Sequence, residues 1–245
     1  MKRIAIANQK GGVGKTVSCY FLAHLFSKDK YNTLIVDMDP QGNLTSCFFQ
    51  EIPYENNIKL LFQGQTPSPI KVEENLFLIG ADITLSKYEA ELKFENFYKL
   101  KNLLDKLTFD IVLVDCPPSL GLFTSNALIA VDYVLAPCDT SKFSLLGLGD
   151  FFETVEKIKE NARTSLEILG IFICGGQERL NLFKNIKSLL EEKYHKYLFD
   201  TVIPYSIKVG ESISQKKTIF DFLPGHKVSK AYNDLYREIK ERIKL

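Results

Sequence analysis

The sequence predicts an α/β protein in which a mostly parallel, twisted sheet carries helices on both faces. Short apolar runs typical of buried parallel strands recur along the chain, and longer segments with apolar residues at helical spacing lie between them. Strands that alternate with helices favour parallel pairing, because each crossover helix packs back onto the sheet. Of the 245 residues, 45% are hydrophobic and 25% are charged, which suits one globular domain spanning residues 1–245.

The expected elements follow from these patterns in chain order. Strands are expected at 4–7, 32–37, 76–79, 110–115, 131–137, 166–174 and 200–204. Helices are expected at 18–26, 57–62, 143–161 and 228–245. In the segment 88–107, apolar residues at helical spacing predict core positions, namely Leu92, Phe94, Phe97, Leu100, Leu103, Leu104 and Leu107. No run approaches the roughly 20 apolar residues of a membrane span.

The first strand leads directly into the stretch Asn8-Gln9-Lys10-Gly11-Gly12-Val13-Gly14-Lys15-Thr16, which predicts a phosphate-binding loop. A strand, a glycine loop and a helix aim backbone N–H groups at one point, with the positive end of the helix dipole behind them. Lys15 is expected to reach the β- and γ-phosphates, and the Thr16 hydroxyl to ligate Mg²⁺. Gln9 replaces the first glycine of the usual pattern, and Lys10 adds a second lysine.

Carboxylates end two of the predicted strands. Asp37 closes the strand 32–37 with Asp39 just beyond it, and Asp115 closes the strand 110–115. Because ligands of open α/β sheets lie at the carboxyl ends of strands, Asp37 and Asp39 are expected to face the phosphates, where a carboxylate can orient water or hold the Mg²⁺ shell. Asp115 fits the Walker B pattern and is expected to bind the water shell of Mg²⁺. A capping role in the following turn is the alternative for Asp39.

Three motifs, at 8–16, 37–43 and 115–121, stand in the order found in the ParA/MinD family of deviant Walker A ATPases, and the chain resembles its ParA-type partition ATPases. The resemblance implies a P-loop NTPase fold with ATP and Mg²⁺ as cofactors, and it ties hydrolysis to Lys10, Lys15 and Asp39. It implies nucleotide contacts at Lys10, Gly11, Gly12, Val13, Gly14, Lys15, Thr16, Val17 and Pro204, and metal contacts at Thr16, Asp39 and Asp115.

The same resemblance implies partners. With ATP bound, two subunits are expected to face each other across two nucleotides as a homodimer, with Lys10 of each reaching the phosphates bound by the other. The dimer is expected to bind DNA nonspecifically and to be released by hydrolysis that a ParB-like centromere-binding protein stimulates. The expected location is the cytoplasm, on the nucleoid in the ATP-bound form, and no membrane partner is expected.

A basic C-terminal quarter is the candidate DNA surface. The net charge is only +1, but residues 184–245 hold thirteen Lys and Arg against eight Asp and Glu. Five lysines are candidates for phosphate contacts without base readout, namely Lys208, Lys216, Lys217, Lys227 and Lys230. Family members often carry arginines after the proline at 204, and lysine keeps the charge but loses the bidentate fork. A merely solvated helical surface is the alternative.

Departures from the family pattern leave some functions open. Val17 stands where relatives usually have a second threonine, and Cys174-Gly175-Gly176 where many have a polar group that reads adenine. A nucleotide-gated scaffold with little turnover is therefore kept as an alternative. A MinD-like positioner of membrane or surface structures is a second alternative. Because no helix-turn-helix precedes Arg3 and no tail follows Leu245, neither operator binding nor membrane binding is expected.

The five cysteines are odd in number, widely spaced and set in apolar surroundings, so reduced buried thiols are expected. A metal-cluster reductase of the nitrogenase iron-protein kind shares the P-loop but would need interface cysteines spaced for a cluster. Cys116 and Cys138 give no clear sign of that spacing. The three histidines are scattered, so a zinc site is not expected either.

Overall fold

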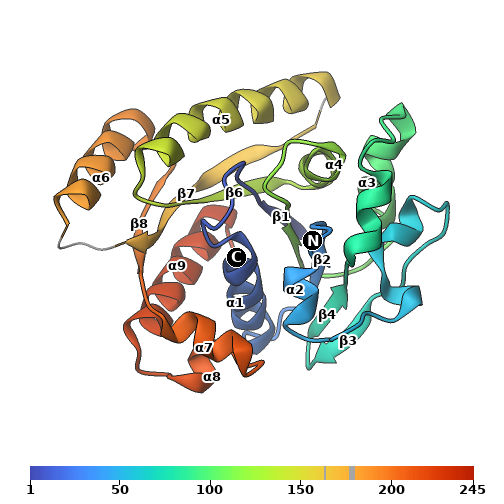
Figure 1. Ribbon diagram of the computed structural model, residues 1–245, viewed down its shortest axis with the longest axis horizontal. Coiled ribbons are helices and arrows are strands. Elements are labelled where there is room, and N and C mark those ends of the chain that lie inside the picture. Colours follow the sequence, from blue (N-terminus) through green and yellow to red (C-terminus); the bar gives the residue numbers. More distant parts are fainter. Residues whose placement is uncertain (163, 177–179) are drawn as a thin grey trace.

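An eight-stranded sheet forms the centre of the molecule, with strand order β3-β4-β2-β5-β1-β6-β7-β8 (Figure 1). The structure is a computed structural model that describes residues 1–162, 164–176 and 180–245, and only the backbone over 142–146. All described neighbours pair in parallel except β3 and β4. The strands are β1 Lys2–Ile6, β2 Thr33–Asp37, β3 Ile70–Glu73, β4 Leu76–Ile79, β5 Ile111–Asp115, β6 Tyr133–Cys138, β7 Glu167–Gly176 and β8 Leu198–Pro204.

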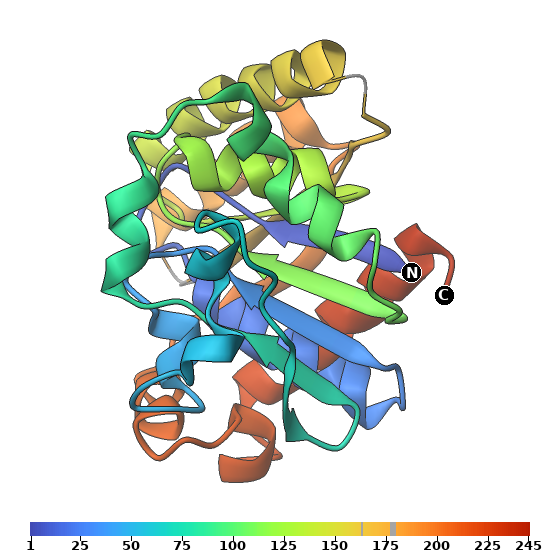
Figure 2. The same ribbon diagram turned by 90° about the vertical axis from the view of Figure 1, so that its right-hand side faces the viewer.

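Helices cover both faces of this sheet, as Figure 1 and the view turned by 90° in Figure 2 show. One face carries α1 Lys15–Lys28, α2 Asn43–Ser46, α7 Lys208–Ser214, α8 Ile219–Phe222 and α9 Lys227–Ile243. The other carries α3 Lys99–Leu104, α4 Leu122–Ala130, α5 Lys142–Ala162 and α6 Asn181–Tyr194. Short 3₁₀ turns complete the chain: η1 Tyr54–Asn56, η2 Ile58–Leu61, η3 Ile83–Tyr88 and η4 Phe94–Tyr98.

Strand residues alternate between two hydrophobic cores. In β1, Ile4 and Ile6 face the core built on α1 and α9, whereas Ala5 faces the core built on α4 and α5. Because successive side chains of a strand point to opposite faces, a continuous apolar run is what a strand covered on both sides requires. The predicted α/β class with a mostly parallel sheet and helices on both faces is thereby confirmed, as are the seven expected strands. The helices expected at 18–26, 143–161 and 228–245 are also present, although the last one ends at Ile243.

The expectation for 88–107 was partly wrong. Leu100, Leu103 and Leu104 are buried in α3, but Leu92 is 67% exposed and Phe94 is 78% exposed. Ahead of α3 the chain runs through tight turns, and the buried Asn96 side chain holds them by donating to the Glu91 carbonyl (2.8 Å). The turns break the helical period, so the first apolar residues of the segment point away from the core.

Other differences concern elements that the patterns did not reveal, namely β3, α2, α4, α6, α7 and α8. The segment 57–62 forms the 3₁₀ turn η2 rather than an α-helix. No helix in the described ranges combines the length and the apolar character that crossing a membrane requires.

The parallel register gathers three strand ends at one edge of the sheet. Asp37 of β2 pairs in register with Asp115 of β5, which in turn pairs with Ile6 at the end of β1. Since β1 runs into the glycine-rich loop, this loop and both carboxylates share one edge. The order β2-β5-β1 therefore positions the candidate site.

Candidate active site

The glycine-rich loop between β1 and α1 has the backbone of a phosphate-binding loop. Gly12 and Gly14 have φ of 75° and 91°, in the left-handed region that favours glycine. No described side chain caps the N-terminus of α1, so its first N–H groups are available to an anion. A Cβ at Gly14 would lie 2.6 Å from the Cys174 sulfur, which is a second reason for glycine at this position.

A cavity of about 480 Å³ opens in front of this loop. Its lining consists of Gly11, Gly12, Gly14, Lys15, Thr16, Val17, Asp39, Gln41, Asn43, Ser46, Cys47, Pro118 and Ile213. The structure thus brings together most residues expected at the nucleotide, and Asp39 with them. Of the expected residues in the described chain, Lys10, Val13, Asp115 and Pro204 lie outside the lining. Pro204 sits at the end of β8, in register with Gly176.

Lys15 is one of the residues that line this cavity. It is only 7% exposed, and its Nζ donates to the Lys10 carbonyl at 2.8 Å, which closes the loop on itself. Burial lowers the pKa of Lys15, whereas the nearby carboxylates of Asp115 and Asp39 raise it. Lys15 is thus a buried cation with carboxylates on one side and, on the other, backbone N–H groups that no described side chain caps. This arrangement suits the binding of a polyphosphate.

Asp115 is fully buried at the end of β5, and neither of its carboxylate oxygens has a hydrogen-bond partner of normal geometry among the described residues. Burial and the nearby Asp37 charge raise the pKa of Asp115, and the Thr16 hydroxyl opposes that rise. A buried polar group without a partner is rare and costly, so its presence needs a reason. Carboxylate and hydroxyl oxygens are the ligands that Mg²⁺ takes in proteins, so Asp115, Thr16 and Asp39 fit this ion.

Asp37 was expected from the sequence to face the phosphates, but it is not among the residues that line the cavity. It is fully buried, its Oδ1 accepts from the Asp39 N–H (3.1 Å), and its Oδ2 accepts from the Thr45 N–H (2.9 Å) and hydroxyl (2.7 Å). Asp39 lines the cavity, and its Oδ1 accepts from the Gln41 N–H at 2.9 Å. The two aspartates of the motif therefore differ: Asp37 holds the loop, and Asp39 is presented to the cavity.

Lys10 is directed away from the cavity within this single chain. Its ammonium lies 2.5 Å from Asp139 Oδ2 and 2.6 Å from Ser141 Oγ, both beyond the end of β6. Its backbone N–H donates to Asn8 Oδ1 at 2.9 Å, and Asn8 is itself anchored to the Pro137 carbonyl. Lys10 is 31% exposed, so its charge stays near the surface rather than over its own phosphate loop.

The position expected to read a base holds a packed sulfur instead. Cys174 lies against Gly14, and burial raises its pKa to about 11, so it is present as a thiol. Tyr232 of α9 lies beside it and shares a hydrogen bond with Ser18 at 2.9 Å. Cys174 therefore supports the phosphate loop from behind, and no base contact is assigned to it.

The cysteines are unpaired, as expected. All five are free, and burial raises the pKa of Cys116 and Cys138, which keeps them as neutral thiols.

The candidate DNA lysines lie on α7, the turn after it and the start of α9, which gather at the lower end of Figure 1. Lys216, Lys217, Lys227 and Lys230 are exposed, and Lys208 forms a half-exposed ion pair with Glu211 (2.7 Å). The Lys216 ammonium also reaches the Phe48 carbonyl beyond α2, at 3.5 Å. The five residues therefore lie on neighbouring elements, one of which, α7, also lines the cavity through Ile213.

Several residues of the site were missed in the sequence. Cys47 and Ile213 line the cavity from α2 and α7, and Asp139 pairs with Lys10 across 129 positions. Thr45 is bonded to Asp37 only eight positions away, yet its role depends on a loop that arrives from β4. A threonine shortly after the 37–43 motif was the only signal available for it.

Comparisons with known proteins agree with this geometry. A family model described as AAA domain (AAA_31) matches residues 1–168. The chain is 32% identical to the chromosome-partitioning ATPase Soj of Thermus thermophilus, with 99% of this chain and 97% of that protein covered. It is 30% identical to the chromosome partitioning protein ParA of Myxococcus xanthus, over 98% of this chain and 88% of that protein. Cobyrinic acid a,c-diamide synthase from Mycobacterium smegmatis, solved with a bound ATP analog and magnesium, matches with a TM-score of 0.84 at 25% identity, covering 100% and 96% of the chains.

Proposed function

The chain belongs to the ParA/MinD family of P-loop ATPases, close to the ParA-type partition ATPases, and on this premise we propose that it is an ATP-dependent ATPase that partitions a plasmid or chromosome. In this proposal two ATP-bound subunits form a sandwich dimer in the cytoplasm. The dimer binds nucleoid DNA nonspecifically, and a ParB-like centromere-binding protein stimulates the hydrolysis that releases it.

One observation carries the enzymatic part of the proposal. Asp115 is a buried carboxylate without a hydrogen-bond partner of normal geometry in the described chain, and it lies beside the first turn of an uncapped helix. Burying such a group costs free energy, and a cation bound at the carboxylate would offset that cost. The Mg²⁺ of a bound nucleotide is the ligand whose chemistry fits.

The residues of the chain have distinct roles in this mechanism. The loop N–H groups and Lys15 bind the β- and γ-phosphates, and Thr16, Asp39 and Asp115 hold Mg²⁺. The chemistry that the ion supplies when bound is charge compensation on the transferring phosphoryl group. Asp39, presented to the cavity by its turn, orients the attacking water. The neighbouring protein of known structure with a bound ATP analog and magnesium supports this cofactor pair.

Dimer formation is proposed to depend on Lys10. Its ammonium is held by Asp139 and Ser141 in the single chain, outside the lining of its own cavity. A cation that is not used by the phosphates of its own subunit can serve those of a second subunit. The triphosphate of the partner then offers the strongest competing anion, so that dimer formation depends on the nucleotide.

A test of the whole proposal is DNA binding measured against salt concentration, in the presence of ADP, ATP or a slowly hydrolysed ATP analogue. We expect binding only with triphosphate, a steep loss of affinity with salt, and no binding by Lys10→Ala. The double variant Lys217→Ala/Lys230→Ala should lower the slope of log affinity against log salt by about 2, because each lysine removed leaves one phosphate without its cation.

Lys106→Ala is the matched control for these variants, because Lys106 is an exposed lysine just after α3, remote from the proposed surface. It should bind DNA as the native protein does. No binding in any nucleotide state would remove the DNA part of the proposal, and liposome binding with ATP would then favour the MinD-like alternative. Tight ATP binding without single-turnover hydrolysis, with or without DNA, would favour the scaffold.

A further inference from the structure

A network of hydrogen bonds lies behind the Asp39 turn and joins three separate segments of the chain. Its first member is Asp37, whose Oδ1 receives the Asp39 N–H and whose Oδ2 receives two donors from Thr45. The Thr45 hydroxyl donates to Asp37 and at the same time accepts from the Ala81 N–H at 2.8 Å. All four residues are buried, so water cannot reach these polar groups and each depends on a partner within the protein.

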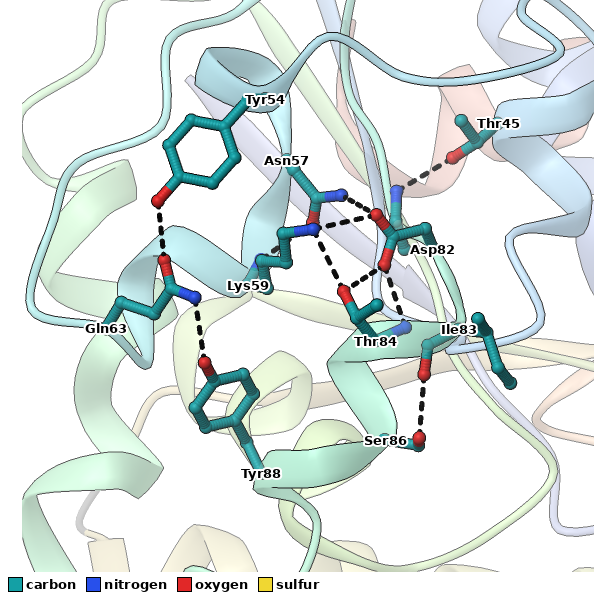
Figure 3. Close-up of polar contacts among 11 residues, drawn as sticks. Thr45, Tyr54, Asn57, Lys59, Gln63, Asp82, Ile83, Thr84, Ser86 and Tyr88 are labelled. Carbon is teal, nitrogen blue, oxygen red and sulfur yellow. Dashed lines mark hydrogen bonds and ion pairs between the residues drawn. The ribbon is translucent and has the colours of Figure 1, made fainter.

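The loop that carries Ala81 cannot easily move. Its neighbour Asp82 accepts hydrogen bonds from Asn57 (2.6 Å) and Lys59 (2.9 Å), and also from the Thr84 N–H and hydroxyl, as Figure 3 shows. On the other side, the Gly80 N–H donates to the Asn56 carbonyl at 3.0 Å. The loop after β4 is thus held by side chains on one side and by backbone on the other.

This loop and the Asp39 turn are packed in close contact. A Cβ at Gly42 would lie 2.9 Å from the Ala81 carbonyl oxygen, and a Cβ at Gly80 would lie 2.9 Å from both branches of the Thr45 side chain. Gly42 also has a positive φ of 61° and ends the turn that Asp39 begins. The turn therefore rests directly on the loop after β4, and Thr45 is the side chain that joins them.

We propose that Thr45 is a positioning residue for ATP hydrolysis. Its hydroxyl clamps Asp37 to the loop after β4, and Asp37 in turn fixes the backbone N–H of Asp39, the carboxylate that orients water in the proposed function. The proposal rests on that proposed function. Thr45 itself is buried and lies behind the turn, so its removal should disturb hydrolysis more than nucleotide binding.

The test compares Thr45→Val, which has nearly the same shape but no hydroxyl, with Thr45→Ser, which keeps the hydroxyl. We expect Thr45→Val to lower kcat for ATP hydrolysis by about 10- to 100-fold, since small misplacements of a reacting group have effects of this size. KM and the ATP affinity should change by less than about threefold, because the phosphate loop is untouched. Thr45→Ser should restore kcat to within about threefold of the native value.

Thr84→Val is the matched control. It removes a threonine hydroxyl that bonds Asp82 rather than Asp37. Asp82 keeps its bonds from Asn57, Lys59 and the Thr84 N–H, so the loop at Ala81 stays held. We expect Thr84→Val to keep the native kcat even if it loses a similar amount of stability. A second measurement, amide hydrogen exchange in the nucleotide-free protein, should show faster exchange at Asp39 and Ala81 in Thr45→Val but not in Thr84→Val.

The outcomes separate this inference from the proposed function. If the native protein hydrolyses ATP and Thr45→Val does so at a similar rate, the inference is overturned while the proposed function stands. Equal loss of kcat in Thr45→Val and Thr84→Val would also overturn it, because it would indicate general destabilisation. If the native protein does not hydrolyse ATP with Mg²⁺, DNA and partner present, the proposed function fails and the inference fails with it.

Discussion

Asp37 and Asp115 occupy equivalent places on neighbouring parallel strands and have opposite environments. Both close a strand of the same register and both are fully buried. Asp37 accepts three hydrogen bonds, whereas Asp115 has no partner of normal geometry in the described chain. In the proposed function, Asp37 serves the fold and Asp115 serves a ligand, and the two differ in hydrogen bonding rather than in burial.

The largest effect is expected on ATP hydrolysis when Asp115 is substituted. Asp115→Asn should lower Mg²⁺-dependent ATP hydrolysis by about 10- to 100-fold and shift its Mg²⁺ dependence to higher concentration, because an oxygen that holds the ion's water shell is lost. Steady-state hydrolysis against Mg²⁺ concentration measures both. Asp110→Asn, at the exposed opposite end of the same strand, is the control and should behave as the native protein. A native Mg²⁺ profile in Asp115→Asn would remove the assigned role.

For the stability of the nucleotide-free protein, substitution of Asp37 should have a larger effect than substitution of Asp115. Asp37→Asn places a donor where Thr45 already donates, so it should lower the free energy of unfolding by about 2–3 kcal/mol. Asp115→Asn removes a buried carboxyl group that has no partner of normal geometry among the described residues, so it should leave that free energy unchanged or raise it by about 1 kcal/mol. Urea unfolding of both variants tests the contrast, which fails if Asp115→Asn is the less stable.

A smaller effect is expected at Val17, which lines the same cavity with an apolar side chain. Val17→Thr adds a hydroxyl where a bound nucleotide offers acceptors, so ATP affinity should rise by about three- to tenfold, the worth of one hydrogen bond. Titration with a slowly hydrolysed analogue measures this affinity. If Val17→Thr binds no better than the native protein, the hydroxyl has no acceptor there.

The smallest effect is expected at a carboxylate that is hydrogen-bonded to a histidine. Glu73 on the edge strand β3 lies 3.2 Å from His24, whose hydrogen bond lowers the pKa of Glu73. A lowered folded-state pKa contributes stability above the unfolded pKa of about 4.3 and loses it as the pH falls through the folded value. Glu73→Gln should therefore cost stability at pH 7 and cost none near pH 3. Because Glu73 is half exposed, the difference should stay below about 1 kcal/mol.

Urea unfolding at a series of pH values checks the Glu73 prediction. The curves of the native protein and Glu73→Gln should converge on acidification. Curves that stay parallel would show that the pair with His24 contributes nothing that depends on the charge of Glu73.

The sequence by itself determined the features that depend on short stretches of chain. Apolar runs identified the seven parallel strands, and the glycines at 12 and 14 identified the loop, because only a few residue types fit left-handed backbone or a strand covered on both faces. The ends of these strands located Asp39 and Asp115 at the edge where the loop lies. These inferences need no knowledge of distant neighbours.

Tertiary structure alone decided how each of these groups is used. Asp37 differs from Asp115 because Thr45 and the loop at Ala81 reach one and not the other. Lys10 is bonded to Asp139, which lies 129 positions away in the sequence. Phe94 stands at helical spacing in the sequence, yet it is exposed to solvent. The physical reason is that hydrogen bonding and burial depend on which distant segments meet, and local sequence fixes the backbone of a segment without fixing its neighbours.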